Sequence, residues 1–138
     1  MKSVVFDTNV LLDIFVFNDF RAIHLKQALL NQQMNALASP KTLEEFADVI
    51  SRPLFCLELG IQEQIMTQWR SAAKILSDET LLRAPWLCQD PDDQVFLNLA
   101  FTVNPSLLIS KDSAVLKLAS RAAKDDVLIT ADYNAFTA

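Results

Sequence analysis

Glycine is almost missing from this 138-residue chain, in which Gly60 is the single example. A dinucleotide-binding fold is therefore nearly excluded, because no glycine-rich phosphate loop can be built. Histidine also occurs once, as His24, which excludes histidine-pair nucleases and histidine-rich zinc sites. We expect His24 to be a partly exposed helix residue. Cys56 and Cys88 lack CxxC spacing, so we interpret them as reduced, buried thiols.

Long apolar runs are missing as well. No run reaches about 18 residues without a polar break, so no membrane span is predicted. At the start, MKSVVFDTN, the apolar stretch is too short for a signal peptide and is soon interrupted by an acid. We therefore expect a cytoplasmic location. Half of the residues are hydrophobic, and the length predicts a single domain over residues 1–138.

Positive charge is in short supply, with 12 basic against 17 acidic residues and a net charge of −5. The charge balance therefore does not indicate general electrostatic binding of nucleic acid. A cluster of carboxylates filled by a divalent metal would reverse the sign of the charge locally. The charge balance thus counts against a non-enzymatic nucleic-acid binder more than against a metal-dependent nuclease.

Short apolar segments alternate with segments of helical pattern along the chain. Strands are predicted at residues 2–6, 35–38, 106–109 and 127–130, and helices at residues 10–17, 19–33, 40–52, 62–77, 91–103 and 113–122. This alternation is typical of an α/β layered fold with a mainly parallel sheet. In such folds, functional sites collect beyond the carboxyl ends of the strands.

Two aspartates occupy that predicted edge. Asp7 directly follows the first strand, and Asp112 comes shortly after the strand in LLISKD. Each could simply cap the helix that follows it, so neither is informative alone. On the middle helix, Glu44 and Glu45 flank an apolar stripe, and Glu45 is placed weakly nearer to the buried side.

Three further aspartates crowd the segment CQDPDDQVF. Asp90 precedes Pro91, an arrangement that suits a helix cap with proline in the first turn. Asp92 and Asp93 then lie where the helix dipole favours acids, but crowding three like charges costs repulsion unless a cation is near. The spacing alone does not choose between Asp92 and Asp93.

Four blocks in this order, VVFDTNVLL, SPKTLEEFADVISRP, CQDPDDQVFLNLA and LLISKD, resemble the PIN-domain family of metal-dependent ribonucleases. They are most similar to the PIN-type toxin components of bacterial toxin–antitoxin systems. The resemblance runs from Val4 to about Phe136 and implies a three-layer α/β/α fold with a central, mainly parallel sheet. It implies four catalytic and metal-binding acids, which are Asp7, Glu45, Asp93 and Asp112.

Details of the resemblance assign the residues that spacing left open. The family glutamate precedes a large apolar residue, which favours Glu45, and the third acid falls seven residues before the helix alanine, which favours Asp93. Asn9 and Ser110 match polar supporting positions. Many relatives carry a second acid two positions after the last aspartate, where this chain has Ala114. That departure puts a second metal site in doubt and leaves the four acids intact.

Carboxylates are the ligands that Mg²⁺ and Mn²⁺ prefer, and a bound metal lowers the pKa of its water and polarises a phosphoryl group. We therefore hypothesise that Asp7, Asp93 and Asp112 hold a first Mg²⁺ or Mn²⁺ ion, while Glu45 orients water or a second ion. RNA as the substrate and an antitoxin protein as the partner come from the resemblance. Four basic residues are candidates for phosphate contact, and the alternative for each is an ordinary charged surface position. They are Lys41, Arg52, Arg83 and Lys111.

Other functions compete with this hypothesis. A PIN-like fold can serve as a non-catalytic module that binds a partner or RNA, and the apolar faces of residues 19–33 and 62–77 either pack in the core or join two copies. An aspartyl-nucleophile phosphatase would need an acid where Asn9 stands. A phospho-acceptor receiver domain would need an acid pair where Val5 and Phe6 stand.

Overall fold

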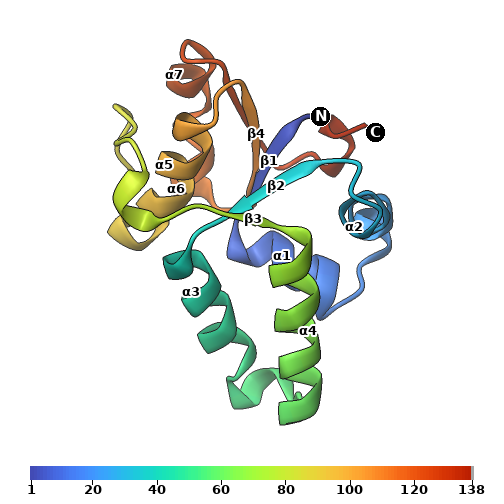
Figure 1. Ribbon diagram of the computed structural model, residues 1–138. Helices are drawn as coiled ribbons and strands as arrows, with labels where there is room; N and C mark the ends of the chain where they lie inside the picture. Colours follow the sequence, from blue (N-terminus) through green and yellow to red (C-terminus); the bar gives the residue numbers. More distant parts are fainter. Residues whose placement is uncertain (138) are drawn as a thin grey trace.

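The computed structural model describes residues 1–137, and its centre is a sheet of five parallel strands in the order β3-β2-β1-β4-β5 (Figure 1). In the middle of the sheet, Val5 pairs with Leu108 and Phe6 with Ile109. All strand pairs are parallel, which confirms the predicted sheet. The strands are β1 (Ser3–Phe6), β2 (Asn35–Ala38), β3 (Lys74–Ile75), β4 (Ser106–Ile109) and β5 (Val127–Thr130).

Within residues 1–137, seven α-helices connect and cover the strands. They are α1 (Thr8–Phe15), α2 (Ile23–Leu30), α3 (Pro40–Ile50), α4 (Leu59–Ala72), α5 (Gln94–Thr102), α6 (Ser113–Leu116) and α7 (Ala119–Ala123). Among the described residues, no helix is long and apolar enough to cross a membrane.

Two hydrophobic cores, one on each face of the sheet, make the structure three-layered. Val4 and Phe6 point into the core under α1–α4, and Val5 between them points into the core under α5–α7. This alternation is the two-residue period of a strand buried on both faces. On the first face, the ring of Trp69 meets Phe6 at 6.2 Å and Phe15 at 6.2 Å between centroids. The expected α/β/α architecture is confirmed.

Several element bounds differ from the prediction. The helix expected over residues 62–77 ends at Ala72, and β3 follows because its backbone pairs with β2 at the sheet edge. The helix expected over residues 113–122 is interrupted between α6 and α7. The expected helix over residues 19–33 begins with a 3₁₀ turn, η1 (Phe20–Ala22), before α2. Cys56 was predicted to be buried and is exposed, whereas Cys88 is half-buried.

Polar side chains on α5 tie down the irregular segment that precedes it. Thr102 Oγ1 accepts the backbone N–H of Leu82, Asn98 Oδ1 accepts that of Ala84, and Gln94 Oε1 accepts that of Cys88. These three acceptors recur every four residues and therefore lie along one face of the helix. These hydrogen bonds hold residues 82–88 beside α5. This segment leads directly into the acidic turn that precedes the helix.

Candidate metal centre

Asp7 stands at the carboxyl end of β1 and caps α1. Its Oδ1 accepts the backbone N–H of Thr8 at 2.7 Å, and its Oδ2 accepts the hydroxyl of Ser110 at 2.6 Å. The residue is only 4% exposed. Both carboxyl oxygens are therefore oriented by fixed donors, one from its own helix and one from the neighbouring strand β4.

Ser110 links Asp7 to Asp112. Its hydroxyl donates to Asp7 and accepts the backbone N–H of Asp112 at 3.0 Å. Asp112 caps the short helix α6 by accepting the N–H of Ala114 at its Oδ1, at 2.9 Å. Asp7 and Asp112 thus keep the capping role that the sequence allows, and the parallel pairing of β1 with β4 brings them together as well.

Asp93 ends the 3₁₀ turn η4 (Pro91–Asp93) and is buried, with 9% of its surface exposed. Asp90 caps this turn by accepting the N–H of Asp92 at 3.0 Å, as predicted, and Asp92 points into solvent. Asp93 Oδ2 is buried and has no hydrogen-bond partner among the described residues. Burial thus distinguishes Asp93 from Asp92, which spacing did not.

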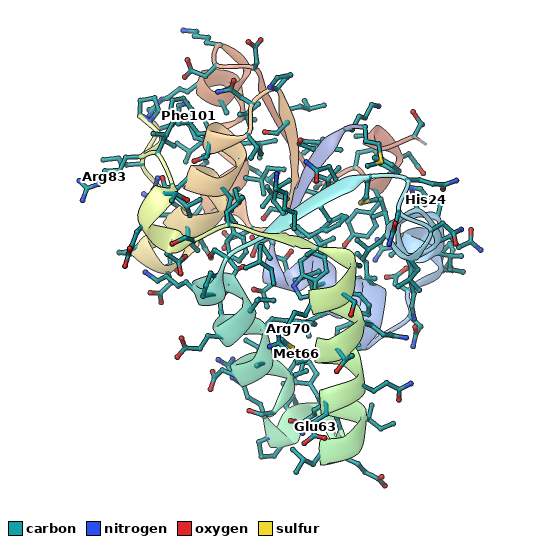
Figure 2. All side chains as sticks on the ribbon, in the orientation of Figure 1. His24, Glu63, Met66, Arg70, Arg83 and Phe101 are labelled. Carbon is teal, nitrogen blue, oxygen red and sulfur yellow. The ribbon has the colours of Figure 1, made fainter. Side chains whose placement is uncertain are left out.

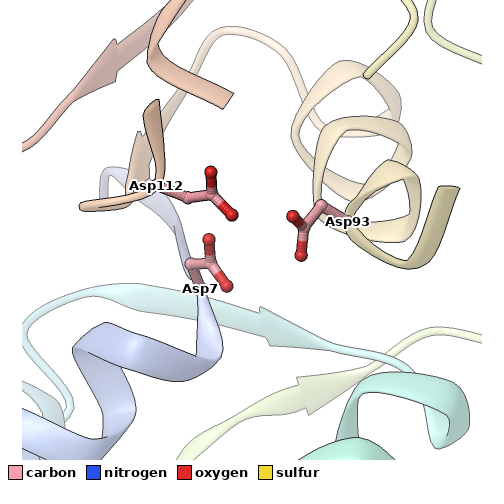
Figure 3. A group of neighbouring side chains, drawn as sticks. All are labelled: Asp7, Asp93 and Asp112. Carbon is pink, nitrogen blue, oxygen red and sulfur yellow. The ribbon is translucent and has the colours of Figure 1, made fainter. Parts of the chain in front are cut away.

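One carboxylate oxygen from each of Asp7, Asp93 and Asp112 lies within 4.8 Å of the other two. Figure 3 shows the three carboxyl groups turned toward one another, Asp93 from the helix side and the other two from the strand ends. No ion pair with lysine or arginine within residues 1–137 involves any of the three. This donor set fits a hard divalent cation, which takes oxygen ligands.

Glu45 lies beside the three aspartates but outside this group of ligand atoms. Its Oε2 accepts the hydroxyl of Thr8 at 2.6 Å, so its carboxylate is anchored one residue away from Asp7. Glu45 is half-buried and Glu44 is exposed, in agreement with the placement from the sequence. Thr8 was missed by the sequence reasoning, and its only signal was its position directly after Asp7.

The electrostatics show a site that lacks positive charge. Burial raises the pKa of Asp7 to about 6, and the charges of Glu45 and Asp112 add to the rise, while the hydrogen bonds from Ser110 and Thr8 oppose it. The pKa of Asp93 is raised well above its usual range, first by burial, then by the facing carboxyl of Asp112 and the charge of Asp7. A bound cation would offset both the cost of burying these charged carboxylates and the repulsion between them.

A second polar network holds the loop between β4 and α6. Asn9 Oδ1 accepts the backbone N–H of Lys111 at 3.3 Å, and Lys111 Nζ donates to Asp13 Oδ2 at 2.7 Å. The Tyr133 hydroxyl donates to the same Asp13 oxygen. Asp13 is 4% exposed, and its buried charge is compensated by the ammonium group of Lys111. The sequence indicated Asn9 and Lys111 as candidates but gave no signal for Asp13 or Tyr133.

The remaining candidates for phosphate contact lie elsewhere. Arg52 pairs with Asp48 at the end of α3. Lys41 and Arg83 line a separate hollow beside the start of α5, and Figure 2 shows Arg83 extending outward from its loop.

Comparison with known proteins adds three findings. The sequence model of the PIN domain matches residues 3–114. A structure described as VapBC2 from Rickettsia felis bound to a DNA fragment from their promoter is similar, with 14% identity and a TM-score of 0.56, over 93% of this chain and 98% of that one. At this identity the likeness shows the fold alone. A sequence comparison with curated proteins finds no significant match.

Proposed function

Because this chain belongs to the PIN domain family, we propose that it is a divalent-metal-dependent endoribonuclease that hydrolyses phosphodiester bonds in RNA. One observation carries the proposal. Asp7, Asp93 and Asp112 converge at the carboxyl edge of the sheet, with a buried, unpartnered oxygen on Asp93. An arrangement of this kind costs free energy without a cation, and its pKa perturbations are typical of functional sites.

In this proposal, Asp7, Asp93 and Asp112 are the residues that would hold Mg²⁺ or Mn²⁺. The ion would supply an activated water and stabilise charge on the phosphate. Ser110 and the Thr8 backbone fix the carboxyl plane of Asp7. With its Oε2 held by the Thr8 hydroxyl, Glu45 would orient water or a second ion.

We further propose that the enzyme is the toxin of a toxin–antitoxin pair and that its partner is the cognate antitoxin. Two observations support this finer proposal. The sequence blocks resemble PIN-type toxins, and the fold is similar to that of the VapBC2 structure.

Cleavage of a mixed-sequence, single-stranded RNA tests the proposal. We expect cutting with Mn²⁺ or Mg²⁺, none in EDTA, and none by the Asp7→Asn variant. Asp92→Asn is the matched control, because it removes an exposed carboxylate next to the site. Undiminished cutting in EDTA or by Asp7→Asn would contradict the proposal. Metal binding by the folded protein without any cutting would favour the non-catalytic module.

A further inference from the structure

A hollow of about 420 Å³, with polar and apolar walls, opens among residues that follow β4 and β5 and residues of η1 and α2. Lys111, which directly precedes Asp112, forms part of its wall, and residues after β5 form another part. The hollow therefore lies at the carboxyl edge of the sheet, the same edge that carries Asp7 and Asp112. Its lining includes Phe20, Arg21, His24, Lys111 and Tyr133, and also one acid, Asp132.

Phe20 gives this hollow an aromatic wall that no core requires. Its side chain is 80% exposed, although large apolar side chains usually gain stability from burial. The 3₁₀ turn that carries it is capped by Asp19, whose Oδ1 accepts the N–H of Arg21 at 2.9 Å. The turn thus holds this exposed aromatic side chain at the surface, where it lines the hollow.

Two cations line the same hollow as Phe20. The Arg21 guanidinium donates to both carboxyl oxygens of Asp19, at 3.1 and 2.7 Å. Lys111 is tied to Asp13, and its side chain is still 39% exposed. Each cation is therefore oriented by its own aspartate, and the hollow brings both of them together with one further acid, Asp132.

His24 supplies a polar group with a defined donor and acceptor. Its Nε2 lies 2.8 Å from the carbonyl oxygen of Tyr133, which only accepts hydrogen bonds. Nε2 therefore carries the proton in this contact, and in the neutral ring Nδ1 is left as an acceptor. Figure 2 shows His24 on α2, on the side of the sheet away from α5 and Arg83.

We propose that this hollow is a subsite for one nucleotide of single-stranded RNA next to the cleaved bond, with its base stacked on Phe20 and its phosphate near Lys111 and Arg21. Single-stranded nucleic acid is bound in this way, by aromatic stacking platforms combined with cations along the backbone. The inference rests on the proposed function, because it names a contact of the same substrate.

Binding of a labelled single-stranded RNA octamer tests the subsite in the Asp93→Asn background, which we expect not to cut the probe. We expect Phe20→Leu to weaken binding about tenfold, since stacking on one base is lost, and Phe20→Tyr to retain affinity. Phe17→Leu is the matched control, because Phe17 is also exposed but packs against Phe55 instead of lining the hollow.

Charge is tested with a second matched pair of variants. Arg21 and Arg52 are equally exposed, at 59% of the side chain, and each pairs with one aspartate. We expect Arg21→Gln, but not Arg52→Gln, to reduce the slope of log affinity against log salt by about 0.7, the value for one phosphate contact on a single strand. Equal slopes for the two variants would remove the phosphate contact from the proposal.

Kinetics of the active protein separate this inference from the proposed function. We expect Phe20→Leu to raise KM about tenfold and to leave kcat nearly unchanged. Cleavage by the wild type with an unchanged KM in Phe20→Leu would overturn the subsite and leave the nuclease standing. If the wild type does not cut RNA, the function fails, and octamer binding still decides the subsite. A change in sedimentation of the RNA-free Phe20→Leu protein would instead make this face a contact between copies, and would overturn the proposal.

Discussion

Replacing Asp7 by asparagine should change how the stability of the metal-free protein depends on pH. Burial lifts the pKa of Asp7 from an ordinary 3.8 to about 6. An acid whose pKa is raised by folding contributes stability below its unfolded pKa, and that contribution is lost as the pH rises through the folded pKa. The shift of about two pH units corresponds to about 3 kcal/mol, which the wild type loses between about pH 4 and about pH 8.

The asparagine variant cannot lose this contribution. Its amide can still cap α1. The weakened hydrogen bond from Ser110 costs about 1 kcal/mol at both pH values, so this cost cancels when the two pH values are compared. We therefore expect the free energy of unfolding of Asp7→Asn, relative to wild type, to improve by about 3 kcal/mol from about pH 4 to about pH 8.

Chemical denaturation in EDTA at the two pH values measures this difference. Asp92→Asn is the control, because its carboxylate is exposed, and it should keep the pH dependence of the wild type. Parallel pH profiles for the wild type and Asp7→Asn would refute the reasoning that the site is a buried, uncompensated acid cluster.

Three further predictions concern the same site. Asp93→Asn should abolish Mn²⁺-dependent RNA cleavage and keep the native circular dichroism spectrum, whereas Asp92→Asn should cut like the wild type. Thr8→Val removes the hydroxyl that holds Glu45 and should lower kcat about tenfold to a hundredfold, as loss of a supporting hydrogen bond does at metal sites; an unchanged kcat would show that Glu45 needs no such support. Saturating Mn²⁺ should raise Tm more at about pH 8 than at about pH 6, because the acids must lose protons to bind it; an equal rise at both pH values would argue against these acids as ligands.

The sequence predicted the strands that bring Asp7 and Asp112 together, because a short apolar segment with an acid within three residues of its end is a local pattern. It did not choose Asp93 over Asp92 by spacing, since the burial of Asp93 and the exposure of Asp92 arise only in the folded protein. The hydroxyl of Thr8, which holds Glu45, was missed because the two residues are 37 positions apart in the chain.

Long-range contacts also explain the other omissions. Asp13 meets Lys111 across 98 positions and Tyr133 across 120, and no periodic pattern encodes such a contact. The strand β3 consists of two residues at the edge of the sheet, and its pairing with β2 decides its conformation over any local preference.

The most direct test of the central claim is one Mn²⁺ titration that measures ion binding by calorimetry and RNA cleavage on the same protein. We expect both to saturate at the same Mn²⁺ concentration, and both to be lost in Asp93→Asn. Cleavage at full rate before the ion binds, or tight Mn²⁺ binding that survives Asp93→Asn, would contradict the claim that this acid cluster is the metal centre of a nuclease.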